Sequence, residues 1–374
     1  MNYFNPVKLV FGSLVRRKIT EECVGKRVLI ICSSTAYNRY SKDPELIALF
    51  SFSSVTFEHD FESNPSLTDI IEISNKYRDS SLDLIVGLGG GSAMDVAKIA
   101  SVSIPAIKEG IHIDELLKDS TLFSRFKEID CIQVPTTAGT GSEVTPFATV
   151  WDYESQQKKS LSHPVMYAKK AFIDPDFLSQ VPLEVAISTG LDALNQAFES
   201  IWNVNANEFT RPLSRRAAEL ALQTLPLIDE ISTSAELREK LATASLFAGL
   251  AISQTRTSIC HSISYPLTLK YGMPHGMACA FSMLEVYKYN SALIKDDIEI
   301  IAFNLKQDPY TALKNIFSQH GLNSHFAKAL PNKSTFTDSI EDFITAGRFE
   351  NNIKKCNRTD LINIITASYN TAVG

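Results

Sequence analysis

The chain has 374 residues, a length that suits two ordinary domains with a full hydrophobic core. Its 36 Lys and Arg residues nearly balance 42 Asp and Glu residues, and the net charge of −6 excludes the strongly basic surface of an electrostatic nucleic-acid binder. The start, MNYFNPVKLVFGS, lacks the basic-then-apolar order of a signal peptide, and no apolar run approaches a membrane span. Six scattered cysteines without paired spacing favour a reducing, cytoplasmic compartment.

Four short apolar runs rich in β-branched residues predict strands in the first half of the chain. They lie at residues 26–32, 54–57, 82–86 and 130–134, and helix-length segments separate them. This alternation predicts an α/β domain whose parallel sheet carries helices on both faces. Because ligands of such sheets collect at the carboxyl ends of the strands, the segments that follow the strands are the candidate binding loops.

The apolar spacing becomes helical from about Pro182 onward, and convincing strand runs are absent there. We place the domain boundary between Pro175 and Pro182. The sequence therefore predicts an α/β domain over residues 1–178 and an all-α domain over residues 179–374. Residues 303–374 form polar helical segments that indicate no particular chemistry.

A glycine-rich run, Gly87–Ser92, follows the predicted strand at 82–86 and leads into a predicted helix. Glycines let a ligand approach the backbone, and the free amides at a helix start attract phosphate. Ser92 can cap this helix or donate to the same anion. The run fits neither GxGxxG nor the P-loop pattern, and a tight turn is the alternative interpretation. The strand before it and the helix after it favour a phosphate site.

A second such loop, Pro135–Glu143, follows the strand predicted at 130–134 and contains two glycines, three threonines and a serine. Its hydroxyl and amide groups can donate to a ligand, while the alternative is a capped loop in which Ser142 opens a helix. Two phosphate-type loops after two parallel strands indicate a dinucleotide more than either loop does alone.

The end of the strand at 26–32 should lie near the adenosine ribose of that dinucleotide. A carboxylate there would accept from the 2′-hydroxyl and repel a 2′-phosphate. The chain instead has Cys32, Ser33, Ser34 and Thr35, which are small and uncharged. This composition favours NADP(H), although the hydroxyls also suit NAD(H).

Carboxylate and imidazole groups in the second half suggest a metal site. Asp192 and Gln196 lie four residues apart and would share one helix face, and His261 and Tyr265 have the same spacing. His275 stands between Pro274 and Gly276. A single histidine is more often a hydrogen-bonded core or surface group, but Asp192 together with His261 and His275 is typical of a metal site. Gln196 stands where a second imidazole would be expected one helical turn after Asp192.

Six motifs occur in one order along the chain: FNPVKLVFGS, GLGGGSAMDVAK, PTTAGTGSEVT, AFIDPDF, TGLDAL and HSISYPLTLKYGMPHG. Over about residues 3 to 290 this series resembles the iron-containing (group III) alcohol dehydrogenases, which are related in fold to dehydroquinate synthase and glycerol dehydrogenase. The resemblance implies an α/β dinucleotide-binding domain followed by a helical metal-binding domain.

The resemblance also implies a set of cofactor contacts for NADP(H) or NAD(H). It assigns the pyrophosphate to the loop at residues 89–92, with Asp95 and Lys98 in the helix behind it. The residues matched to cofactor-binding positions are Ser33, Gly89, Gly90, Gly91, Ser92, Asp95, Thr136, Thr137, Thr140 and Lys158. Of these, Ser33 comes from the strand-end argument above, and the others match family positions.

A divalent metal, Fe²⁺ in preference to Zn²⁺, is implied by the same resemblance, in which one aspartate and three histidines are the ligands. Asp192, His261 and His275 match three of the four positions, and Gln196 takes the fourth. A glutamine oxygen is neutral like imidazole, but it is a weaker and harder donor. Tyr265 takes the place of a histidine linked to proton relay, and its ordinary pKa of about 10 suits pH 7 less well.

The implied reaction is the reversible, metal-dependent reduction of an aldehyde to a primary alcohol. The segment QAFESIWNVNAN at residues 196–207, with HSISYPLT, is similar to the subgroup that reduces phosphonoacetaldehyde to 2-hydroxyethylphosphonate. Arg256, five residues before His261, is the first candidate to bind the phosphonate, ahead of Lys270 and Arg215; a solvated or ion-paired arginine is the alternative.

Other functions stay open at this point. They include a general alcohol dehydrogenase for short or medium-length chains, a hydroxy-acid (semialdehyde) dehydrogenase, a dehydroquinate-synthase-like lyase and a catalytically impaired nucleotide-binding homologue. The motifs PTTAGTGSE and GMPHG favour the dehydrogenases over the lyases. The resemblance also implies a homo-oligomer, with a dimer as the first expectation.

Overall fold

The computed structural model describes residues 3–13, 15–52, 54–155, 157–343 and 349–373. These residues divide into two compact units, and the main chain passes from one to the other between Leu178 and Ser179. The first unit contains residues 5–137 and 142–178; the second contains residues 3–4, 138–141 and those from 179 onward. The outermost positions of the two predicted domains, Met1, Asn2 and Gly374, lie outside the described residues.

The first unit is built on a six-stranded sheet in which every neighbouring pair is parallel. In spatial order the strands are β1 (Lys8–Phe11), β8 (Lys170–Ile173), β5 (Cys131–Pro135), β4 (Leu84–Gly89), β2 (Val28–Ile31) and β3 (Val55–Glu58). The four predicted strands correspond to β2, β3, β4 and β5. The edge strand β1 and its partner β8 were not predicted.

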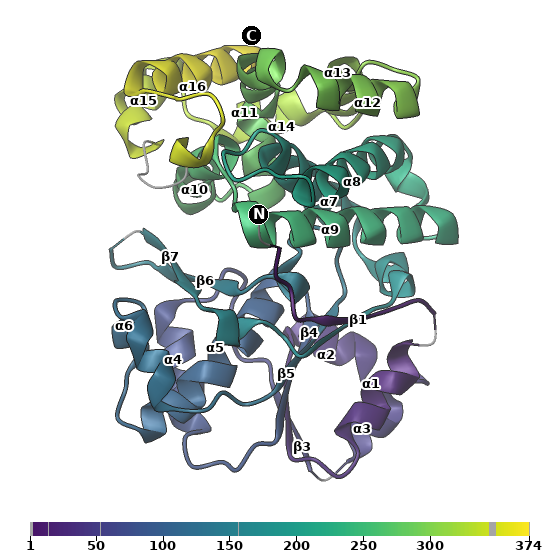
Figure 1. Ribbon diagram of the computed structural model, residues 1–374, viewed down its shortest axis with the longest axis vertical. Coiled ribbons are helices and arrows are strands. Elements are labelled where there is room, and N and C mark those ends of the chain that lie inside the picture. The colour runs from purple at the N-terminus through teal and green to yellow at the C-terminus, as the bar shows by residue number, and fades with distance from the viewer. Residues whose placement is uncertain (1–2, 14, 53, 156, 344–348, 374) are drawn as a thin grey trace. The chain divides into compact units, whose positions relative to one another are not determined.

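Helices cover both faces of this sheet, as the parallel arrangement requires. In β2, Val28 and Ile30 pack into one apolar cluster while Leu29 and Ile31 pack into another, because successive side chains point to opposite faces. Figure 1 shows the purple helices α1 and α3 on one side and the blue helices α4 and α5 on the other. The bounds are α1 (Val15–Cys23), α2 (Ser34–Tyr40), α3 (Ile47–Ser51), α4 (Leu67–Lys76), α5 (Gly91–Lys108) and α6 (Ile113–Leu116).

A second, antiparallel pair of strands, β6 (Phe147–Asp152) and β7 (Gln157–Ser162), follows the loop after β5. This pair was not predicted either. Short 3₁₀ turns complete the first unit and lead out of it, at Ser120–Arg125, Ser142–Val144, Pro164–Met166 and Pro175–Gln180.

The second unit is helical, and none of its described residues forms a β-strand, which confirms the predicted all-α class. Its helices are α7 (Leu183–Ile201), α8 (Thr210–Thr224), α9 (Ala235–Thr255), α10 (Ile259–Tyr271), α11 (His275–Asn290), α12 (Lys295–Leu305), α13 (Pro309–Gln319), α14 (Leu322–Ala329), α15 (Lys333–Asp338) and α16 (Arg358–Val373). Single 3₁₀ turns lie at Leu225–Glu230, Ser291–Leu293, Ile340–Phe343 and Phe349–Asn351. None of the described helices combines the length and the apolar composition needed to cross a bilayer.

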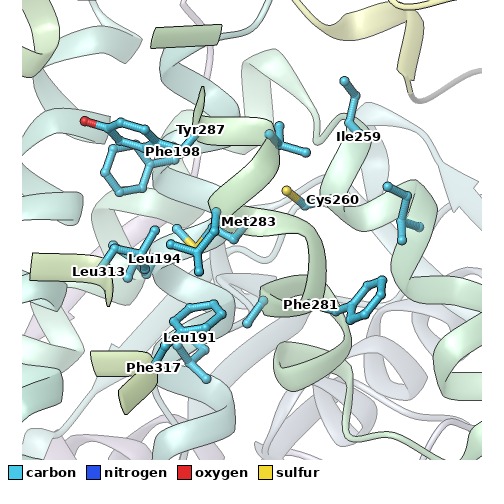
Figure 2. Close-up of a cluster of buried hydrophobic side chains, with 14 of the residues drawn as sticks. Leu191, Leu194, Phe198, Ile259, Cys260, Phe281, Met283, Tyr287, Leu313 and Phe317 are labelled. Carbon is cyan, nitrogen blue, oxygen red and sulfur yellow. The ribbon is translucent and has the colours of Figure 1, made fainter. Parts of the chain in front are cut away.

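The core of the helical unit forms where α7 and α11 pack against each other. Figure 2 shows side chains from both helices converging there, with Leu191, Leu194 and Phe198 on α7 and Met283 and Tyr287 on α11. The rings of Phe198 and Tyr287 meet edge to face, with centroids 5.4 Å apart. This packing fixes the two helices that carry most of the candidate metal ligands.

Candidate functional site

The two glycine loops, residues 87–92 and 135–143, begin side by side at the ends of the paired strands β4 and β5. β4 ends at Gly89, which is in register with Pro135 at the end of β5, and Thr136 N donates to Gly89 O at 2.9 Å. Gly90 is the residue before α5, so the first amides of an 18-residue helix follow the loop. A Cβ at Gly89 would lie 2.8 Å from that of Ala93. The chain therefore needs glycine here, and it presents backbone amides at the carboxyl edge of the sheet.

Asp95 and Lys98 fasten α5 to the segment that follows the second loop. The Asp95 carboxylate accepts from Ser142 Oγ at 2.5 Å and from Thr149 N at 2.8 Å. Lys98 is fully buried, and its ammonium donates to Ser142 O at 2.9 Å, to Thr145 Oγ1 at 3.1 Å and to Phe147 O. Burial lowers the pKa of Lys98, which Asp95 partly offsets at 3.3 Å. The two residues thus fix the backbone around both loops.

The other predicted cofactor residues are distributed over both units. Ser33 lies after β2, the neighbour of β4, and its hydroxyl caps α2 by accepting from Ala36 N at 3.2 Å. Ser92 Oγ accepts from Asn64 N at 3.3 Å. Lys158 lies on β7 with its ammonium 5.4 Å from the ring centre of Trp151. The sheet edge therefore gathers Ser33, Gly89, Gly90, Gly91, Ser92, Thr136 and Thr137, whereas Thr140 belongs to the helical unit.

Three helices of the second unit bring four potential ligands together. Asp192 on α7, His261 on α10, and His275 and Cys279 on α11 place one ligand atom each within 4.8 Å of one another. His261 Nε2 lies 3.4 Å from Asp192 Oδ1, and Cys279 Sγ lies 3.9 Å from His275 Nε2. Asp192, His261 and Cys279 are buried, and His275 is partly buried. Asp192, His261 and His275 were predicted from the sequence, whereas Cys279 was not.

Gly276 explains how the start of α11 reaches α7. A Cβ at this position would lie 1.8 Å from Ser188 O, a backbone atom that cannot rotate away. Only glycine allows this approach, which sets His275 next to Asp192. The Pro274-His275-Gly276 sequence thus has a packing reason in addition to any chemical one.

Glu199 orients His261 and was also missed. It is fully buried, and its Oε1 accepts from Cys260 N at 2.6 Å and from His261 N at 3.2 Å. Its Oε2 lies 2.5 Å from His261 Nδ1. A carboxylate at Nδ1 favours the tautomer with its proton on that nitrogen. The lone pair of Nε2, which faces Asp192, can then bind a metal. Glu199 follows Asp192 by seven residues, which places both on one face of the helix. This spacing could have indicated Glu199 from the sequence.

The charge state of His261 reflects several neighbours. Burial by itself lowers the pKa of this imidazole, but Cys279, Glu199 and Asp192 outweigh burial and raise the pKa well above its ordinary value. Conversely, burial raises the pKa of Asp192, and His261 and His275 outweigh it and lower that pKa. The negatively charged neighbours of His261 therefore favour a positive charge at this position, whether it is carried by the imidazolium or by a bound cation.

Gln196 lies one turn after Asp192 and is equally buried. Its Nε2 donates to Thr140 O at 3.3 Å. Among the residues that the structure describes, no donor reaches Gln196 Oε1 or Asp192 Oδ1 with hydrogen-bond geometry, and both atoms are inaccessible to solvent. Buried acceptor oxygens without donors are costly unless a cation is present, so the residues fit a divalent metal.

Arg256 and Tyr265 lie on either side of His261 along the chain. The buried Tyr265 ring lies nearly parallel to that of His275, at 10° with centroids 6.5 Å apart. Arg256 lies between α9 and α10 with φ 67°, the left-handed region that disfavours side chains. Its carbonyl accepts from Asn203 Nδ2 at 3.2 Å.

The two alternative cations are engaged elsewhere. Lys270 forms an ion pair with Asp342 at 2.5 Å, and Arg215 one with Asp297 at 3.3 Å.

Two family models match most of the chain. The family model described as iron-containing alcohol dehydrogenase matches residues 6–175. The model of the C-terminal part of the Fe-containing alcohol dehydrogenase family matches residues 186–369. Together the two matches span both units and all the candidate site residues.

The chain is also similar to individual proteins with named activities. A phosphonoacetaldehyde reductase of Streptomyces viridochromogenes is 32% identical over 247 residues, which are 64% of this chain and 60% of the relative. A 1-propanol dehydrogenase of Salmonella typhimurium is 27% identical over 293 residues, 78% of this chain and 75% of the relative. The solved sulfoacetaldehyde reductase of Bifidobacterium kashiwanohense, in complex with NAD⁺, is 25% identical with a TM-score of 0.83 over 99% of both chains.

Proposed function

This chain belongs to the iron-containing alcohol dehydrogenase family, and on that basis we propose that it reduces phosphonoacetaldehyde to 2-hydroxyethylphosphonate with NAD(P)H. The observation that carries the substrate is the similarity to a phosphonoacetaldehyde reductase. A structural relative named a sulfoacetaldehyde reductase supports the same substrate class, because both aldehydes have two carbons and an anionic group. The proposed class is therefore a small anionic aldehyde.

Asp192, His261 and His275 hold a divalent cation in this proposal, with Gln196 as the fourth donor in the set taken from the sequence. The support is the close grouping of their ligand atoms and the two buried oxygens that lack hydrogen-bond donors. A bound divalent cation polarises a carbonyl oxygen as a Lewis acid. Glu199 contributes by keeping His261 in the tautomer that offers Nε2.

The nicotinamide cofactor supplies the hydride, and the residues of the chain supply binding and a proton. The amides at the start of α5 bind the pyrophosphate, with the second glycine loop beside them. Tyr265 Oη is the proposed proton donor to the product oxygen, because its ring is stacked beside His275. The residues that follow β2, with Ser33 among them, are uncharged, and on this ground we favour NADP(H) over NAD(H).

Arg256 binds the phosphonate in this proposal. A non-glycine residue held at φ 67° stores conformational strain, and such residues cluster at functional sites. Arg256 is preferred to Lys270 and Arg215 because it precedes the predicted ligand His261 by five residues, in the segment that leads into α10. A guanidinium suits the several oxygens of a phosphonate through paired hydrogen bonds.

The proposal is tested by steady-state kcat/KM for phosphonoacetaldehyde, butanal and succinic semialdehyde. We expect the phosphonate to exceed the other two by at least about tenfold, the worth of one charge-assisted hydrogen bond. Replacing Arg256 by Met should raise KM for phosphonoacetaldehyde roughly 10- to 100-fold and leave KM for butanal unchanged. Arg215→Met is the matched control and should change neither. Equal efficiency on all three aldehydes would refute this substrate.

A general short-chain alcohol dehydrogenase is the second candidate. The similarity to a 1-propanol dehydrogenase, which extends over more of the chain, favours it. The same assay separates the two, because this alternative predicts the highest kcat/KM for butanal and no effect of Arg256→Met on any substrate.

We further propose that the protein acts in the cytoplasm and as a homodimer. All six cysteines are free thiols, and five of them are buried, as suits a reducing compartment. The mass in solution, measured by light scattering, tests the dimer directly; a monomer at working concentration would overturn this part of the proposal.

A further inference from the structure

Cys279 lies where a metal ligand would be expected, although neither the sequence pattern nor the family match assigns it that role. It follows His275 by one turn of α11, so both side chains lie on the same helix face. Its side chain is fully buried, and Sγ is 3.9 Å from His275 Nε2. Sγ also lies within 4.8 Å of the ligand atoms of Asp192 and His261.

The distances in this cluster suit a four-coordinate ion. Zinc bonds of about 2.0–2.3 Å in a tetrahedron place ligand atoms roughly 3.5 Å apart. Two contacts in the cluster are close to that spacing: Asp192 Oδ1 to His261 Nε2 at 3.4 Å, and Cys279 Sγ to His275 Nε2 at 3.9 Å. Asp192 Oδ1 is buried, and apart from the His261 Nε2 contact at 3.4 Å it has no donor among the described residues, which suits a cation at this position.

Gln196 is less well placed to complete the set. Its Oε1 is buried without a hydrogen-bond donor in the described chain, but an amide oxygen is a weak ligand for Fe²⁺ or Zn²⁺. A thiolate is the stronger ligand and carries the charge that a neutral amide lacks.

We propose that the Cys279 thiolate is a direct ligand and completes an Asp192, His261, His275 and Cys279 site in place of the imidazole missing at position 196. The inference rests on the proposed metal-dependent function and specifies its ligands. On binding, the thiol proton is released to solvent and the sulfur forms a bond to the cation. A thiolate favours Zn²⁺ over harder ions, and the two anionic ligands, Asp192 and Cys279, balance the charge of the cation.

Cobalt substitution tests the ligand directly. The wild-type protein loaded with one equivalent of Co²⁺ should show a near-ultraviolet thiolate-to-cobalt charge-transfer band. Cys279→Ser should lose the band and bind Co²⁺ at least about tenfold more weakly, since a hydroxyl is a poorer ligand than a thiolate. Gln196→Ala should keep the band. Cys260→Ser is the matched control, because Cys260 is an equally buried thiol of the same unit that packs in the hydrophobic core, and it should also keep the band.

X-ray absorption spectroscopy of the wild-type zinc protein identifies the atoms bound to the metal without any variant. We expect one sulfur at about 2.3 Å together with nitrogen and oxygen neighbours. Stoichiometric metal without a sulfur neighbour, or a cobalt band that survives in Cys279→Ser, would overturn the inference and leave the proposed function standing. Wild-type protein that takes up no divalent metal would overturn both.

Discussion

Glu199 shows how one buried carboxylate can decide the chemistry of a neighbouring residue. It binds the backbone of Cys260 and His261 with one oxygen and His261 Nδ1 with the other. The first two contacts fix the start of α10, and the third turns Nε2 toward Asp192. Position and tautomer of His261 therefore depend on the same side chain.

Glu199→Gln removes the charge at Nδ1 while keeping the size of the side chain. We expect the affinity for Zn²⁺ or Fe²⁺ to fall roughly 10- to 100-fold, because the partner that orients a metal-binding histidine has effects of this size. The measurement is titration of metal-depleted protein with Zn²⁺ in competition with a chromophoric chelator. Glu219→Gln is the matched control, since Glu219 is also a buried carboxylate of the helical unit and is bonded to Asn304. Equal losses of affinity in both variants would show a general effect on folding instead.

Single residues of the candidate site differ in how far the sequence could indicate them. Asp192, His261 and His275 were identified because they fall in motifs that resemble a family, and the structure does bring them together. Cys279 and Glu199 were missed because their neighbours come from different helices. The spacing of His275 and Cys279 places them on one face of α11, but only the packing against α7 and α10 makes that face part of a site.

Helix α5, which begins at the proposed phosphate site, is held to the second loop by the buried ammonium of Lys98. Lys98 has no exposed surface, and its hydrogen bonds go to carbonyl and hydroxyl groups of residues 142–147. Removing it would leave those oxygens and Asp95 without their partner.

Lys98→Met should lower the free energy of unfolding by about 3 kcal/mol, the cost of leaving one half of a buried charged pair. Urea denaturation followed by circular dichroism measures this. Lys108→Met is the control. Lys108 lies at the end of the same helix and is exposed, and its ammonium donates to Ser80 O in the described part of the chain. We expect its unfolding free energy to stay within about 0.5 kcal/mol of wild type. Similar losses in both variants would contradict the account of Lys98.

Strands with a local sequence pattern were predicted, whereas strands that depend on distant pairing were not. β2, β4 and β5 were predicted because they are fully buried and consist largely of apolar residues. β1 was missed because Lys8–Phe11 is mostly exposed, so it has no continuous buried run. Its pairing with β8 joins residues from opposite ends of the α/β unit, with Lys8 opposite Lys170, and no local pattern specifies such a pairing.

At the scale of the whole molecule, the chain combines a dinucleotide-type α/β unit with a helical unit that holds a compact cluster of metal-type ligands. The class of both units followed from hydrophobic periodicity alone. The family followed from six ordered motifs, and the matches to both halves of the family agree with it. Substrate and metal depend on a few side chains, which is why they require experiments on this protein.

We propose that hydride transfer in this protein needs a divalent metal bound by the helical unit. The most direct measurement is aldehyde-dependent oxidation of NADPH by protein dialysed against a chelator, with cofactor binding followed in parallel by fluorescence. The account predicts that cofactor still binds, that turnover is lost, and that one equivalent of Zn²⁺ or Fe²⁺ restores turnover. Undiminished turnover by protein shown to be free of metal would contradict it.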